Sequence, residues 1–188
     1  MEVLFVQGGG KDVHDEWDNT LVESLEQELG RDYAVSYPRM PHEADPKYAD
    51  WRAALTLQFA RLDEGAMLVG HSIGGTILIR TIADELSKKT FGGIFLIAAP
   101  FVGDGGWPSD DVEPLSELGV RLPEQTPIYL YHGNQDDTAP LAHVDLYARA
   151  IPQAIVRRLS GRDHQLNNDL SDVAADIRHV RAARRLPE

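Results

Sequence analysis

The sequence contains no cysteine, which excludes disulfides, thiolate metal sites and cysteine nucleophiles. Basic side chains are also scarce: 18 Lys and Arg stand against 30 Asp and Glu, and the formal net charge is −12. Such a charge repels phosphate backbones and anionic membrane surfaces, so we expect neither nucleic acid nor a membrane as a partner. No apolar run approaches the ~20 residues that span a bilayer. Residues 1–6 lack a basic region and predict a first strand rather than a signal peptide, which favours the cytoplasm.

What the sequence does have is a regular alternation of strand and helix patterns. Its 188 residues suit one domain, covering 1–188, with a sizeable core. Helices are expected at 14–29, from Asp45-Pro46 to Leu62, at 73–86, at 140–151 and after 168. Strands are expected at 2–7, 33–37, 66–69, 93–98, 127–132 and 154–159. This alternation predicts parallel βαβ units in a three-layer α/β/α sandwich.

Helix-start signals predict Asp45 as the cap of the second helix and Asn167 or Asn168 as the cap of the last one. The apolar residues Trp17, Leu21, Val22, Leu25 and Leu29 recur at helical spacing and predict the inward face of the first helix.

Periodicity fails over residues 100–126, where glycine, proline and acidic residues dominate. A long irregular excursion of this kind is usually functional, so we expect it to cover the site, with one short helix near 111–118. Phe101 and Trp107 are candidates for the substrate pocket, and ordinary loop packing would explain them equally well.

The pattern Gly70-His71-Ser72-Ile73-Gly74 follows an apolar run and precedes a helical one. Gly-x-Ser-x-Gly in this setting is typical of a strand, a tight turn and a helix, with Ser72 at the corner as a candidate nucleophile. A Cβ at Gly70 or Gly74 would collide with the adjoining strand or helix. Chance alone produces the bare pattern in roughly one sequence in twenty, and a helix N-cap is the rival interpretation of Ser72.

A serine hydroxyl needs a base to remove its proton, and the base needs a third group to orient it. Asp136 follows the fifth predicted strand and His164 follows the sixth, so both lie at the carboxyl edge of the sheet with Ser72. Asp137 competes with Asp136 for the role of the acid. The order Ser, Asp, His is that of the α/β-hydrolase arrangement.

The remaining histidines are less suited to act as the base. His71 is fixed beside the nucleophile, and His132 ends a strand. His14 either lines the pocket or lies on a helix surface. Solvated side chains are expected at His42, His143 and His179.

These motifs, with Gln7-Gly8-Gly9-Gly10, Gly133-x-x-Asp136 and Gly161-x-x-His164, resemble the α/β hydrolases. In particular, the chain is similar to the small serine-hydrolase family that includes retinoblastoma-binding protein nine. The resemblance implies a mostly parallel six-stranded sheet of order 2-1-3-4-5-6 without a large lid domain. Its spacing of glycine and acid favours Asp136 over Asp137.

An oxyanion formed at the substrate carbonyl needs preorganised N–H donors. Ile73, directly after Ser72, supplies one. The family pattern assigns the second to Gly9, with Gly10 as the alternative, because Gln7 stands where many hydrolases carry histidine or proline. Gly10 and His71 are further pocket candidates. No Lys-Ser/Thr follows the glycines, which argues against a phosphate-binding loop.

The sequence therefore predicts a serine hydrolase that cleaves small carboxylic esters through an acyl-enzyme, without metal or cofactor. Amidase or thioesterase activity would use the same three residues. The alternative is a hydrolase-fold interaction module that binds a protein partner and turns over little.

Overall fold

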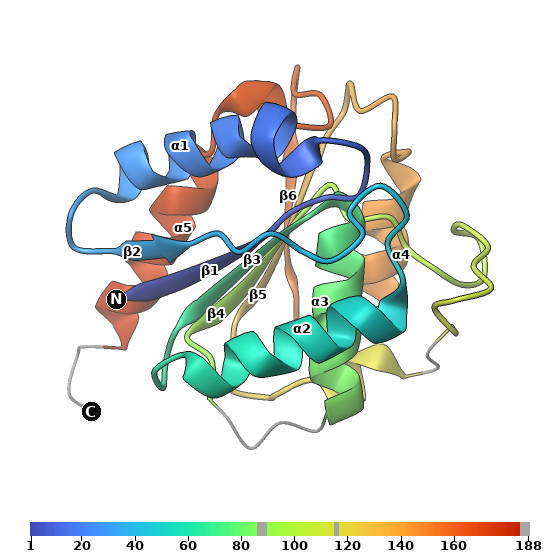
Figure 1. Cartoon of the computed structure of the whole chain (residues 1–188), viewed down its shortest axis with the longest axis horizontal. Helices are drawn as coiled ribbons and strands as arrows, with labels where there is room; N and C mark the ends of the chain where they lie inside the picture. The colour runs from blue at the N-terminus through green and yellow to red at the C-terminus, as the bar shows by residue number, and fades with distance from the viewer. Residues whose placement is uncertain (86–89, 115–116, 185–188) are drawn as a thin grey trace.

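The computed structural model describes residues 1–85, 90–114 and 117–184. Six parallel strands form one sheet in the order β2-β1-β3-β4-β5-β6, as the resemblance implied (Figure 1). The strands are β1 (Glu2–Val6), β2 (Ala34–Ser36), β3 (Met67–His71), β4 (Gly93–Ile97), β5 (Ile128–Gly133) and β6 (Ile155–Leu159). Every residue of β3 and β4 is buried, as expected for parallel strands covered on both faces.

Helices cover both faces of this sheet and complete the predicted three layers. Helices α1 (Asp18–Leu29) and α5 (Ser171–Ala183) lie on one face (Figure 1). The other face carries α2 (Tyr48–Arg61), α3 (Ser72–Glu85) and α4 (Ala142–Ala150). Each face has its own apolar core. Among the described residues, every helix is too short or too polar to cross a lipid bilayer.

The first helical segment differs from its prediction at the start. A five-residue π-helical turn, Val13–Trp17, precedes α1 and shifts the register of the chain. Trp17 is consequently 55% exposed, and Asp18 takes the inward position that the apolar pattern gave to its neighbour. The rest of the predicted stripe is confirmed, because Leu21, Leu25 and the other apolar members are buried.

Both predicted helix caps are wrong. Helix α2 begins at Tyr48, whose N–H donates to the carboxylate of Asp111 from the irregular segment, while Asp45 pairs with Lys47. At α5, the N–H of Ser171 donates to Asp169 Oδ1 at 3.0 Å.

Asn167 and Asn168 belong instead to a separate 3-10 turn, Leu166–Asn168, and both have positive φ. That turn lies upstream of the helix start, so neither side chain reaches the first turn of α5. The predicted end of α3 at residue 86 lies outside the described residues.

The segment from residue 100 to 126 is irregular, as predicted, but the short helix near 111–118 is wrong. Residues 111–114 are not helical, and the Ser109 hydroxyl accepts the N–H groups of Asp111 and Val112 in a turn. A 3-10 turn, Leu118–Arg121, follows instead. Residues 115 and 116 lie outside the description.

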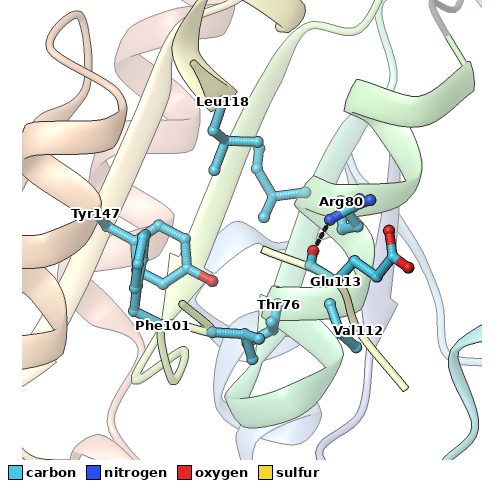
Figure 2. Close-up of a pocket in the computed structure, with 9 residues that line it drawn as sticks. Thr76, Arg80, Phe101, Val112, Glu113, Leu118 and Tyr147 are labelled. Carbon is cyan, nitrogen blue, oxygen red and sulfur yellow. Dashed lines mark hydrogen bonds between the residues drawn. The ribbon is translucent and has the colours of Figure 1, made fainter. Parts of the chain in front are cut away.

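This segment packs against α3 and α4. Figure 2 shows the guanidinium of Arg80, on α3, donating to the carbonyl of Glu113. Between these parts lies a small cavity of about 30 Å³, lined in part by Thr76, Phe101 and Tyr147. The described contacts of the segment are therefore with α2, α3 and α4, and its covering of Ser72 itself stays a prediction.

Candidate active site

Ser72 lies at the corner between β3 and α3 with a positive φ of 51°, a strained conformation for a residue with a side chain. The turn is tight enough to require glycine on both sides. A Cβ on Gly70 would lie 2.6 Å from the Cα of Gly75, and one on Gly74 would lie 1.9 Å from the carbonyl oxygen of Gln7. The collisions predicted from the sequence are confirmed, and the serine side chain is held at the carboxyl edge of the sheet.

His164 contacts Ser72, and Asp136 contacts His164, so the three side chains form a chain of hydrogen bonds. The Nε2 atom of His164 lies 3.0 Å from Ser72 Oγ, and its Nδ1 atom lies 2.9 Å from Asp136 Oδ2. With a neutral imidazole, Nδ1 donates to the carboxylate and Nε2 accepts from the hydroxyl. Asp137 is exposed and its carboxylate contacts Thr138, so the neighbouring acid takes no part in this line.

The carboxylate of Asp136 is held from several sides. Its Oδ1 accepts the N–H groups of Thr138 and Ala139 at 2.9 and 2.8 Å. Its Oδ2 lies 3.1 Å from Nε2 of His132 in addition to His164. Burial by itself raises the pKa of Asp136, but the hydrogen bonds from His132 and His164 outweigh it and lower that pKa. Asp136 is therefore ionised at neutral pH and accepts from Nδ1 of His164.

Of the three glycines after β1, Gly9 faces the corner. The N–H of Gly8 donates to Asp18 Oδ2 and that of Gly10 to the carbonyl of Glu43, each at 2.6 Å. Within the described part of the chain, the N–H of Gly9 has no acceptor. A Cβ on Gly9 would lie 2.7 Å from Cγ2 of Ile73. The two expected oxyanion donors therefore belong to neighbouring residues.

The loop register is fixed by Gln7, the residue that departs from the common hydrolase pattern. Its amide donates to Glu43 Oε2 at 2.7 Å, and its Oε1 accepts the N–H of Met40 at 2.9 Å. The side chain is fully buried. Gln7 thus ties the glycine loop to the chain that follows β2.

His71 is the last residue of β3, directly before Ser72, and its ring is almost fully buried. Its Nδ1 is 2.9 Å from Asp18 Oδ2, and its Nε2 is 3.1 Å from the backbone carbonyl of His164. Sequence reasoning missed Asp18. The available signal was its position three and four residues before Leu21 and Val22, which places an acid on an inward apolar face.

Two pocket candidates, Phe101 and Trp107, contact His143. This residue is 4% exposed, so its expected solvated side chain is wrong. Its Nδ1 accepts the N–H of Phe101 at 2.7 Å, and its ring packs edge-on against Trp107 with centroids 5.5 Å apart. His143 on α4 therefore anchors the start of the irregular segment.

The remaining histidines, His14, His42 and His179, make no contact with Ser72, Asp136 or His164 among the described residues. His14 stacks on Tyr37 with ring centroids 4.1 Å apart. His42 and His179 are exposed, as predicted. Among the described residues, no cluster of three or more histidine or acidic side chains is arranged to hold a metal ion.

Comparison with known proteins identifies the same fold by sequence and by structure. The family described as the alpha/beta hydrolase family matches residues 3–186. No curated protein sequence matches significantly. The ydeN gene product of Bacillus subtilis superposes with a TM-score of 0.76 at 18% identity, over 96% of this chain and 98% of that one.

Two further structures have similar folds. For a SOBER1 variant from Arabidopsis thaliana the TM-score is 0.69 at 15% identity, covering 96% of this chain and 99% of that one. For Est1E of Butyrivibrio proteoclasticus, solved with ferulic acid bound, it is 0.67 at 14% identity, covering 97% and 88%. At these identities the likeness establishes the fold alone.

Proposed function

Because the chain belongs to the α/β hydrolase family, we propose that it is a serine hydrolase that cleaves small carboxylic esters through a covalent acyl-enzyme. The observation that carries this proposal is the line from Asp136 through His164 to Ser72, with separations of 2.9 and 3.0 Å. A nucleophile within hydrogen-bond reach of a base, and a base oriented by an acid, is the arrangement that activates a serine hydroxyl.

In the proposed reaction, Ser72 Oγ attacks the ester carbonyl while Nε2 of His164 takes its proton. Asp136 keeps the imidazole in the correct tautomer and stabilises its charged form. Collapse of the tetrahedral intermediate breaks the bond to the alcohol, which leaves with the proton from His164. A water molecule, deprotonated by His164, then attacks the acyl group. The bond between the acyl carbon and Ser72 Oγ breaks, His164 returns the proton to Oγ, and the carboxylic acid leaves.

We assign the oxyanion hole to the N–H groups of Ile73 and Gly9. Ile73 is the second residue of α3, where helix geometry leaves the N–H without an acceptor in the helix. The N–H of Gly9 is the one glycine donor of the described loop that is free, which favours Gly9 over Gly10. Preorganised donors of this kind stabilise the negative charge that develops on the carbonyl oxygen.

Small esters are the substrate class that we favour. Esterases occur among the structures that share this fold, and Est1E was solved with ferulic acid bound. Phe101 and Trp107 lie on the segment that packs against α3 and remain our candidates for contact with the acyl or alcohol group.

The proposal is tested with p-nitrophenyl acetate and a fluorophosphonate probe. Ser72→Ala should lower kcat by on the order of 10⁴ to 10⁶ without changing the fold, and should abolish labelling. Ser36→Ala, at an exposed serine of β2, serves as the matched control and should behave as the wild type. Full turnover by folded Ser72→Ala would contradict the proposal, and an unlabelled wild type would favour a binding module instead.

A further inference from the structure

A continuous set of buried hydrogen bonds connects Asp18 and His71 with the two loops on either side of Ser72. The N–H of Gly8 and Nδ1 of His71 both donate to Asp18 Oδ2, at 2.6 and 2.9 Å. Nε2 of His71 then donates to the backbone carbonyl of His164 at 3.1 Å. These bonds connect the glycine loop, the residue before Ser72 and the loop that carries the candidate base. The bond from His71 to His164 alone joins residues that are 93 positions apart in the sequence.

The proton positions follow from the acceptors. A carbonyl oxygen only accepts, so Nε2 of His71 must carry a proton, and Nδ1 faces the carboxylate of Asp18. The Asp18 side chain is fully buried, and His71 is 2% exposed. Burial lowers the pKa of His71, but the charge of Asp18 outweighs it and the pKa is raised. A cationic His71 beside the Asp18 side chain therefore fits the geometry and the raised pKa of the imidazole.

We propose that Asp18 and His71 are positioning residues, a buried ion pair that holds the oxyanion loop and the His164 backbone in place around Ser72. This inference rests on the proposed hydrolase function.

The position of the pair explains how it would act on each side. Gly8, which Asp18 anchors, is the residue before the proposed oxyanion donor Gly9. A Cβ on Gly8 would lie 3.2 Å from Nδ1 of His71, so the loop rests directly on the imidazole. On the other side, His71 fixes the carbonyl of His164 itself, and the two rings are 4.9 Å apart. Loss of the pair would let both groups shift, and misplacement by about 1 Å costs on the order of 10²-fold in rate.

The pair also sets the charge beside the base. A cationic His71 disfavours a second positive charge on the neighbouring His164 ring. If a neutral residue replaces His71, no positive charge balances the carboxylate of Asp18, which then favours protonation of His164 instead. The acid limb of the pH profile, where kcat/KM falls because the base becomes protonated, should then move to higher pH.

Other charged groups also face the His164 ring or its loop. Asp136 contacts the far side of the ring, and His132 shares that carboxylate. On the loop itself, Arg162 pairs with Asp169, and the carboxylate of Asp163 accepts the N–H of Asn167. The variants below leave all of these groups unchanged.

Two substitutions separate the two arms of His71. His71→Asn places an amide nitrogen near the Nδ1 position, which retains the bond to Asp18 and loses the bond to His164. His71→Gln places its nitrogen near the Nε2 position and does the reverse. Both remove the positive charge. His179→Gln, at an exposed histidine of α5, is the control.

The experiment measures fluorophosphonate labelling and p-nitrophenyl acetate kinetics over a range of pH, with a thermal melt of each variant. We expect both His71 variants to lose on the order of 10²-fold in kcat with KM little changed, to label correspondingly slowly, and to have an acid limb at higher pH. The control should match the wild type. Folded His71 variants with wild-type kcat and acid limb would overturn the inference.

A second measurement uses only the wild-type protein, so it tests the inference even if a His71 variant fails to fold. Ring-nitrogen NMR of the wild-type protein should find both nitrogens of His71 protonated at neutral pH, and a neutral ring would overturn the ion pair. Failure of the proposed function is distinguishable, because it would appear as an absence of labelling in the wild type itself.

Discussion

At the scale of single residues, Asp136 serves two histidines at once. Its Oδ2 is 2.9 Å from Nδ1 of His164 and 3.1 Å from Nε2 of His132, and the latter nitrogen is also 2.8 Å from the carbonyl of Ala139. His132 is almost fully buried. A second donor draws on the same negative charge, so it weakens the hold of Asp136 on a protonated base.

Replacing His132 should therefore change the pH dependence of the reaction. In His132→Leu, Asp136 keeps more of its charge for His164, the base is easier to protonate, and the acid limb of kcat/KM should move to higher pH. His132→Gln restores a nitrogen donor near the Nε2 position and should return the limb toward that of the wild type. The measurement is kcat/KM from about pH 5 to 8. An acid limb that does not move in a folded His132→Leu protein would contradict the role of the shared carboxylate.

Single residues also mark how far the sequence predicts the site. Ser72, Asp136 and His164 follow motifs on three loops, and the structure brings their side chains within hydrogen-bond distance. Asp18 and His143 carry no motif. Their positions depend on a π-helical turn and on a loop that returns across α4, and local patterns do not encode either.

At the scale of elements, helices α2 and α5 are capped by residues that local signals did not select. The carboxylate of Asp111, in the irregular segment, accepts the N–H of Tyr48 at the start of α2, and the two residues are 63 positions apart in the sequence. Asp169 accepts the N–H of Ser171 while it pairs with Arg162. Strand and helix cores follow from periodicity. The cap of α2 depends instead on a carboxylate that the tertiary fold brings from far along the chain, while the cap of α5 is local and lies one residue beyond the predicted Asn168.

Asp169→Ala should lower the free energy of unfolding by about 1 kcal/mol at neutral pH, because the cap of α5 is lost. Asp169→Asn retains an oxygen acceptor and should cost less. Hydrogen bonds from Ser171 and then Arg162 lower the pKa of Asp169 from 3.8 to about 2.

A lowered carboxyl pKa contributes stability above the unfolded value, which is lost as the pH falls through the folded value. The stability difference between the wild type and Asp169→Ala, measured by urea unfolding, should therefore shrink between pH 3.8 and about 2. A difference that stays constant over this window would contradict the assignment.

At the scale of the whole molecule, the parallel sheet places three separate loops at one edge. Strands β3, β5 and β6 all end there, in the order that the resemblance implied. The alternation of elements was sufficient to predict this edge. Distances within it depend on side-chain packing, which a sequence pattern does not specify.

The net charge of −12 should select among substrates. An ester that carries a carboxylate is repelled by the acidic surface, and salt screens that repulsion over a Debye length of about 10 Å at 0.1 M. We expect kcat/KM for an anionic ester to rise with ionic strength, while kcat/KM for neutral p-nitrophenyl acetate stays nearly constant. Equal salt responses of the two esters would contradict electrostatic selection.

The central claim is that Ser72 forms the acyl-enzyme. Mass spectrometry of the protein quenched during p-nitrophenyl acetate turnover tests it most directly, because it identifies the acylated side chain. We predict an acetyl group on the peptide that contains Ser72, and its absence in His164→Ala. Turnover with the acetyl group on another residue, or with no covalent adduct at all under conditions that trap the intermediate, would contradict the account.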